Sequence, residues 1–134
     1  MNAMSHYGFL ITRIGLSFVL FWFGGKQLAN PSVWTGFVPP DLAAISPLSL
    51  EQVVLLNGTG ELVLGTLVLV GVYTRIIAAL SALHLASIAL MLGLTPAGVR
   101  DWGLAAAFLG LVFTGPGRYS LDILFLKKQN KNPE

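Results

Sequence analysis

Four long stretches of apolar residues alternate with shorter polar or proline-rich segments. They lie at residues 8–28, 52–72, 76–95 and 101–114. The first three are each about twenty residues long, and a helix of that length rises about 30 Å, which is the thickness of the hydrocarbon layer of a bilayer. The pattern therefore predicts an all-α membrane protein, a bundle of four transmembrane helices that forms a single membrane domain over residues 1–134.

The fourth apolar stretch is shorter than the others, at about fourteen residues or roughly 21 Å. Thr95, Pro96 and Gly98, which precede it, are typical of a turn. Asp101 is well suited to cap the helix and to face the positive end of its dipole. We expect this helix to cross with little tilt, to thin the bilayer locally, or to be re-entrant.

Composition supports a membrane location. Hydrophobic residues make up 54% of the chain and charged residues 10%, and the mean hydropathy is +0.75, whereas roughly 25% of residues are charged in soluble domains. The net charge is +2 and the pI 9.2, but the basic residues are not gathered on one polar face with aromatic residues between them. We therefore expect the lipid bilayer, and no nucleic acid, as a partner.

The chain has no cysteine, which excludes disulfides, thiolate nucleophiles and Cys-ligated metal centres in this subunit. Of its two histidines, His6 lies near the N-terminus and His84 in the middle of an apolar stretch, so a haem bound by both within one subunit is not expected. We predict no metal site and no built-in cofactor. Any redox cofactor would be a bound small molecule or would belong to a partner.

Basic residues predict the orientation in the membrane. Residues 1–7 lack Lys and Arg, so we expect the first helix to be retained and not cleaved as a signal peptide. Four spans place both termini and the turn at residues 72–75 on one side. That side collects most of the basic residues, namely Arg75, Arg118, Lys127, Lys128 and Lys131. The positive-inside rule then puts both termini and the tail, residues 115–134, in the cytoplasm.

The connection at residues 29–51 is the longest in the chain and would lie outside. It contains four prolines together with Trp34 and Phe37. Two interpretations are open for it. The segment is either an anchor with its aromatic rings at the level of the lipid headgroups, or a lid over a pocket that opens on this side.

Two ionisable residues in the middle of apolar helices are the candidate catalytic residues. Glu61 shares a helix face with Asn57 and Gly65, and that face should look into the bundle. His84 lies on a polar stripe of the next helix. Ionisable residues inside a membrane usually mark functional sites, so we predict that Glu61 or His84 exchanges protons with a ligand. In the alternative interpretation, Glu61 pins two helices together and serines hold His84 as a helix-packing contact.

Further residues complete the predicted binding site. Counting along the helices places Trp22 at the depth of Glu61 with Lys26 nearer the outer face, and the two share a helical stripe, so they are predicted to line one cavity with Glu61. Arg13 is predicted to pair with Asp122 or with the carbonyl groups of the break at residues 115–117. The predicted ligand-binding residues are Arg13, Trp22, Lys26, Asn57 and Asp101. The aromatic and apolar wall is expected from Phe18, Phe21, Trp22 and Phe108.

Short motifs along the chain resemble those of the DoxX family. They are Arg13-Ile14-Gly15, Gly24-Gly25-Lys26, Gly60-Glu61-Leu62, Gly71-Val72-Tyr73-Thr74-Arg75, Arg100-Asp101 and the run from Gly115 to Asp122. The resemblance covers residues 8–126 and rests on the order and spacing of the motifs. It implies a four-helix protein of the bacterial or archaeal inner membrane, of a family named from a subunit associated with quinol oxidase and thiosulfate:quinone oxidoreductase. The motif residues that carry over are Arg13, Lys26, Glu61, Arg75, Asp101, Ser120 and Asp122.

Two functions follow as hypotheses. In the first, the chain is a subunit of a quinone-linked oxidoreductase system and binds a quinone or a similar small apolar ligand near Glu61. Its partner would then be a redox complex or further copies of the same chain. In the second, the chain is a non-catalytic scaffold or small-molecule carrier. A well-shaped cavity that reaches Glu61 would favour binding, and a tightly packed salt bridge there would favour the scaffold.

Overall fold

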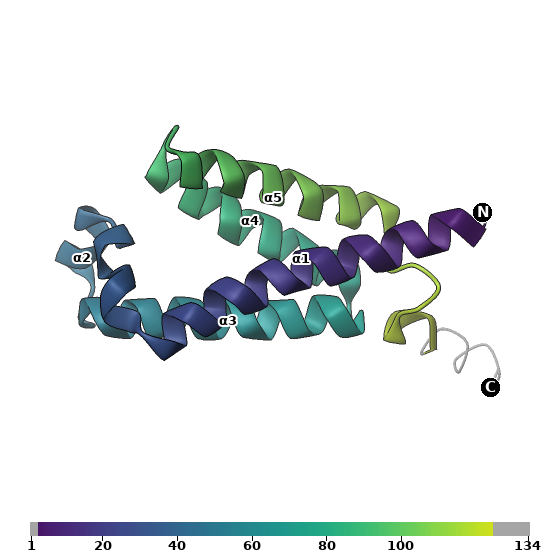
Figure 1. Ribbon diagram of the computed structural model, residues 1–134, viewed down its shortest axis with the longest axis horizontal. Coiled ribbons are helices and arrows are strands. Elements are labelled where there is room, and N and C mark those ends of the chain that lie inside the picture. Colours follow the sequence, from purple (N-terminus) through teal and green to yellow (C-terminus); the bar gives the residue numbers. More distant parts are fainter. Residues whose placement is uncertain (1–2, 125–134) are drawn as a thin grey trace.

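Four long helices form an elongated bundle (Figure 1). The computed structural model describes residues 3–124, and side chains from residue 7 onward. The elements are α1 (Ala3–Ala29), the 3-10 helix η1 (Pro31–Phe37), α2 (Pro40–Ile45), α3 (Leu50–Val70), α4 (Thr74–Leu92) and α5 (Pro96–Thr114). All four long helices are apolar enough to cross a membrane, over Tyr7–Ala29 in the case of α1. The protein is a multi-pass membrane protein.

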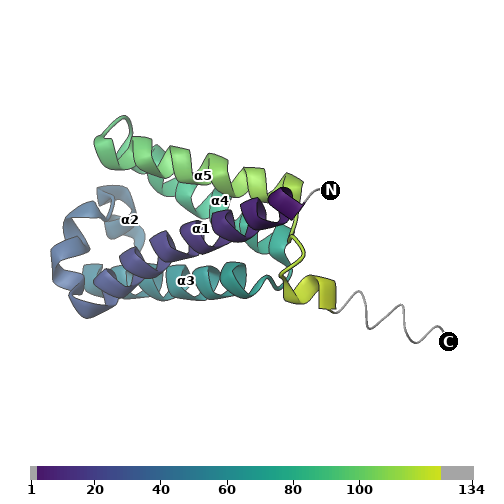
Figure 2. The same cartoon turned by 45° about the vertical axis from the view of Figure 1, so that its right-hand side comes forward.

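The helices run up and down, with α1 packed mainly on α3 and α4 on α5. Two views show η1 and α2 at one end of the bundle and the start of α1 at the other (Figures 1 and 2). We call these the lid end and the terminal end. Between the two helix pairs lies an apolar core, to which every long helix contributes. Its buried residues are Leu16, Leu20, Val68, Ala78, Ala82, Leu85, Ala105, Phe108 and Leu111.

Local sequence sets the helix ends. At the start of α3 the side chain of Ser49 accepts a hydrogen bond from the backbone of Gln52, and the Gln52 side chain accepts one from the Ser49 backbone. This helix ends at Val70, and the next residue, Gly71, caps it with a φ of 76°, a left-handed conformation that glycine adopts without strain. The turn to α4 then follows directly, as expected from the sequence.

The predicted start of the fourth helix is wrong. Helix α5 begins at Pro96, and Thr95 caps it by accepting a hydrogen bond from the backbone N–H of Gly98 at 3.2 Å. Proline is compatible with the first turn of a helix because the N–H groups of that turn have no acceptor within the helix, so a missing N–H costs no hydrogen bond. Asp101 therefore lies in the second turn and does not cap the helix. With 19 residues, or roughly 28 Å, α5 is long enough to cross.

An arginine closes the terminal end of the bundle. Arg13 is 1% exposed and donates hydrogen bonds to four backbone carbonyls. They belong to Val68 and Leu69 at the end of α3 and to Pro116 and Tyr119 after α5. Of the two partners expected for Arg13, the carbonyls of the break after α5 are confirmed.

Asp122 does not form the pair with Arg13 that was considered for it. It accepts hydrogen bonds from the backbone N–H groups of Tyr73 and Thr74, at 2.7 and 2.8 Å, and so caps α4. The segment after α5 continues as a helical turn at residues 121–124. The basic tail residues Lys127, Lys128 and Lys131 lie outside the described residues.

Candidate functional site

A cavity of about 330 Å³ lies at the lid end of the bundle. Every long helix contributes to its wall, together with η1 and α2. Most of the lining is apolar and includes Val19, Leu20, Phe23, Val54, Leu85, Ile88, Leu92 and Leu104. The polar lining residues are Gln27, Asn57, Glu61, Arg100 and Asp101. An apolar cavity with a few converging polar groups is the usual form of a small-molecule site.

Glu61 lies within a ring of amide groups. Its side chain is buried, at 4% exposure. Gln27 Nε2 donates to Glu61 Oε2 at 3.2 Å, and Asn57 Nδ2 donates both to Glu61 Oε1 at 3.1 Å and to Gln27 Oε1 at 2.9 Å. Both carboxylate oxygens therefore have an N–H partner without any cation. The prediction that Glu61 faces into the bundle beside Asn57 is confirmed.

Close contact between α1 and α3 brings Gln27 to Glu61. A Cβ added to Gly24 would lie 2.7 Å from the carbonyl oxygen of Gly58, and one added to Gly58 would lie 2.9 Å from Gln27 Cβ. Because only glycine fits at both positions, the two backbones approach within reach of the short Gln27 side chain. The site thus depends on these glycines as well as on its polar groups.

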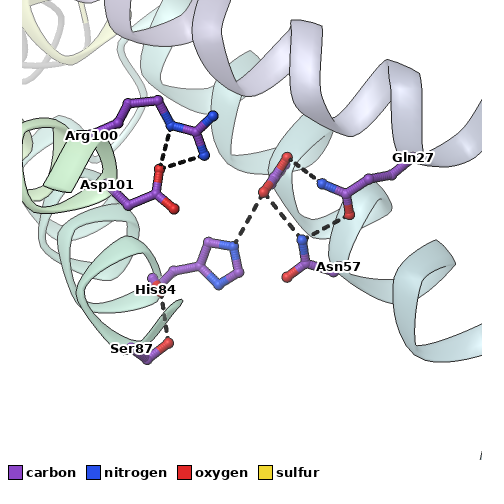
Figure 3. Close-up of polar contacts among 7 residues, drawn as sticks. Gln27, Asn57, His84, Ser87, Arg100 and Asp101 are labelled. Atoms are coloured by element: carbon purple, nitrogen blue, oxygen red, sulfur yellow. Dashed lines mark hydrogen bonds and ion pairs between the residues drawn. The ribbon is translucent and has the colours of Figure 1, made fainter. Parts of the chain in front are cut away.

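His84 reaches Glu61 from α4. Its Nε2 lies 3.8 Å from Glu61 Oε1 and is buried without a hydrogen-bond partner among the described residues. The nearby serines do not hold the ring, because Ser81 bonds to the carbonyl of Ile77 and Ser87 to the carbonyl of His84 itself. Figure 3 shows the imidazole directed toward the amide cluster of Gln27 and Asn57, while Ser87 bonds behind it. The imidazole thus lies close to the carboxylate of Glu61 without a hydrogen bond to it.

Arg100 and Asp101 form a second polar group in the cavity wall, opposite Gln27 and Asn57 (Figure 3). The Asp101 side chain is buried. Its Oδ1 accepts a hydrogen bond from Arg100 Nε at 2.8 Å and forms an ion pair with Arg100 Nη2 at 2.7 Å. The guanidinium also lies 4.1 Å from the centre of the Phe23 ring. This cation–π contact joins α5 to α1 at the cavity.

The connection between α1 and α3 covers the cavity, as expected of a lid. Trp34 and Phe37 of η1 line it together with Leu42 of α2. Trp34 contacts Phe23 edge to face, with ring centres 5.9 Å apart, and lies 5.7 Å from Phe37. Of the two interpretations of this segment, the geometry favours the lid.

Three of the five predicted ligand-binding residues lie outside the cavity, namely Trp22, Lys26 and Arg13. Trp22 is 53% exposed on the outer face of α1, and Lys26 is exposed with its Nζ 5.1 Å from the Trp22 ring centre. The prediction that Trp22 and Lys26 line one cavity with Glu61 is wrong, because Gln27 occupies that place. The expected aromatic wall is also wrong: Phe18 is 62% exposed and Phe108 belongs to the core, whereas Phe23, Trp34 and Phe37 line the cavity.

Arg13 does not reach the cavity either, since its bonds to backbone carbonyls hold it at the terminal end. Asn57 and Asp101 do line the cavity as predicted. Gln27 and Arg100 are site residues that the sequence interpretation missed. One signal for Gln27 was available, because it lies 14 residues after Arg13, close to four helical turns, and so shares its buried face.

Among residues 3–124, no group of three or more His, Cys, Asp or Glu side chains is arranged to hold a metal ion. Neither a curated protein nor a solved structure was found to match the chain.

The family described as TQO small subunit DoxD matches residues 24–134, which is most of the chain. TQO stands for thiosulfate:quinone oxidoreductase, a membrane redox complex. This match confirms the resemblance seen in the sequence motifs. The chain belongs to the DoxD family, which is part of the DoxX-like family of small four-helix membrane proteins.

Proposed function

We propose that the chain acts as the small membrane subunit of a quinone-linked oxidoreductase, and that the cavity beside Glu61 binds the ring of a quinone. The family name supports the first part, since it describes the small subunit of thiosulfate:quinone oxidoreductase. The quinone site is supported by the apolar cavity that Glu61 lines.

The lining residues fit such a ring. A volume of about 330 Å³ lies at the lower end of the roughly 300–1,000 Å³ of small-molecule sites. Phe23, Trp34 and Phe37 supply aromatic surface for stacking against a flat ring. Gln27 Nε2 donates once to Glu61 and has a second N–H for a ring carbonyl. The Glu61 carboxyl can donate to a ring carbonyl when it holds a proton, and can accept from a ring hydroxyl when it does not.

Each polar residue has a role in this proposal. A bound quinone would supply the redox chemistry, because its reduction takes up electrons and protons. Glu61 lines the cavity, so its carboxylate is the group placed to hold a proton beside the ring. His84 does not line the cavity, and its Nε2 lies 3.8 Å from Glu61 Oε1. After Glu61 has given its proton to the ring, His84 would protonate Glu61 again. The lid residues Trp34 and Phe37 would exclude water from the ring.

The electrons would come from a partner. This chain has no cysteine and hence no thiol chemistry of its own. As a small subunit it would receive electrons from the large subunit of the complex, docked on the bundle. A homo-oligomer without that partner is the alternative assembly.

The second candidate is the scaffold or carrier. One observation favours the scaffold: the bonds among Gln27, Asn57 and Glu61 tie α1 to α3 and satisfy both carboxylate oxygens. A scaffold would not need the cavity that these residues line, and so ligand binding accounts for more of the geometry.

For the orientation we propose that the terminal end faces the cytoplasm of a bacterial or archaeal cell, with the lid end outside. Arg75 and Arg118 lie at the terminal end, as the positive-inside rule requires of the cytoplasmic side. A reporter fused to the C-terminus should be active only in its cytoplasmic form. Activity of a periplasmic reporter there would contradict the orientation.

A bound quinone can be tested directly. The full chain would be purified from its host membrane in mild detergent, extracted with organic solvent, and its quinone content measured by mass spectrometry. Wild type and Glu51→Gln, a control on the exposed start of α3, should retain quinone, and Glu61→Gln should lose most of it. The absence of quinone from the wild type, or equal amounts in wild type and Glu61→Gln, would contradict the proposal.

A further inference from the structure

We infer that Arg100 binds the ring oxygen that points away from Glu61, so that the ligand is held between two polar walls. The inference rests on the proposed function, namely that a quinone ring occupies the cavity. It adds the residue that would distinguish a ring with two opposite oxygens from a ring with one.

Within residues 7–124, the guanidinium of Arg100 has donors that Asp101 does not use. Its contacts with Asp101 Oδ1 use Nε and Nη2, and neither uses Nη1. Arginine is always charged and donates through five N–H groups in a rigid plane. Because Asp101 is 2% exposed and Phe23 stacks on the guanidinium, the cation is held at the cavity from two sides.

The two walls come from different helix pairs. Gln27 and Glu61 belong to α1 and α3, whereas Arg100 and Asp101 belong to α5. All four line the same cavity, and Figure 3 shows Arg100 and Asp101 on one side and Gln27 on the other. The lining between them is mainly apolar, so a flat ring would find hydrogen-bonding groups only at these two walls.

The chemistry of the two walls matches a ring with oxygens at opposite ends. A quinone carbonyl accepts hydrogen bonds, and a charged donor such as Arg100 gives the stronger type. The oxygen at the other end would lie beside Glu61 and Gln27. In a ring with one carbonyl, that oxygen can accept hydrogen bonds at only one of these walls.

Two ligands of similar size can show whether the ring is held at both polar walls or at one. Menadione is a two-ring quinone with opposite carbonyls, and tetralone has two rings with one carbonyl. Binding of each to the full chain in detergent would be measured by titration calorimetry, with a detergent blank. The variants are Arg100→Gln and Glu61→Gln, with Arg118→Gln as control because Arg118 is exposed at the terminal end.

We expect menadione affinity to fall about tenfold in each variant. Arg100→Gln loses a charge-assisted hydrogen bond, and Glu61→Gln loses the bond that the carboxyl donates to a ring carbonyl when it holds a proton. Tetralone affinity should fall in only one of the two variants. Arg118→Gln should bind both ligands as wild type does. Because Arg100→Gln leaves Asp101 buried without its cation, the double variant R100Q/D101N is measured in parallel and should show the same loss for menadione.

Menadione binding that is unchanged in Arg100→Gln and in the double variant would overturn the inference, while leaving the proposed quinone site in place. Tetralone binding that falls in both single variants would overturn it as well, since one carbonyl cannot contact both walls. If neither ligand binds to the wild type, the proposed function fails, and the inference fails with it.

Discussion

Gln27 Nε2 lies 3.2 Å from Glu61 Oε2 and joins α1 to α3 through a buried acid. The neighbouring Lys26 points to the outer face of α1 instead. The buried carboxylate is thus held by neutral amides, and the lysine that was expected to line one cavity with it lies outside that cavity.

Replacing Gln27 with leucine should therefore destabilise the protein. The change leaves Glu61 Oε2 buried without its donor, and we expect a loss of about 1–3 kcal/mol in the free energy of unfolding. Lys26→Leu is the matched control and should change stability by less than about 0.5 kcal/mol, since Lys26 is exposed. Unfolding in detergent, followed by circular dichroism, measures both. Equal effects of the two changes would contradict the assigned partners.

The error over Lys26 has a simple physical origin. Trp22 lies nine residues after Arg13, which is half a turn away around a helix at 100° per residue. Once Arg13 is known to be buried, Trp22 and Lys26 must face outward. The sequence interpretation gave Arg13 the carbonyls of the break after α5 as possible partners, but a lone arginine in an apolar helix gives no sign of the carbonyls of Val68 and Leu69 that also hold it.

Other features were predictable because they depend on local pattern. The four spans follow from runs of apolar residues, and the burial of Glu61 follows from its stripe with Asn57 and Gly65. The cavity wall was not predictable, since it depends on how η1 and α2 fold back over the helix ends. The start of α5 was missed because Pro96 can belong either to a turn or to a first helical turn.

Gly58→Ala should disturb the site through the backbone. An added Cβ would lie 2.9 Å from Gln27 Cβ and 3.0 Å from the carbonyl oxygen of Gly24, so α1 must move away, at a cost of about 1–3 kcal/mol. Gly60→Ala in the same helix meets no atom within 4 Å and should stabilise the protein by about 0.5–1 kcal/mol. Thermal unfolding of both variants tests this. A Gly58→Ala protein as stable as Gly60→Ala would show that the two helices do not pack so closely.

Arg13→Gln should be among the most damaging single changes in the chain. A glutamine cannot supply the charged donors that reach carbonyls on α3 and after α5, and we expect a loss of about 3 kcal/mol or more. The same substitution at exposed Arg118 should cost less than about 0.5 kcal/mol. Unfolding curves in detergent compare the two. If Arg13→Gln were as mild as Arg118→Gln, Arg13 would not close the bundle.

The most direct test of the quinone site uses Trp34 as a reporter. The variant Trp22→Phe/Trp102→Phe keeps Trp34 as its only tryptophan of the three in the chain, and Trp34 lines the cavity. In lipid nanodiscs, added menadione should quench its fluorescence along a saturating curve, and Glu61→Gln should weaken the affinity about tenfold. Quenching that rises in proportion to the menadione in the bilayer, and that is identical in Glu61→Gln, would contradict a quinone site beside Glu61.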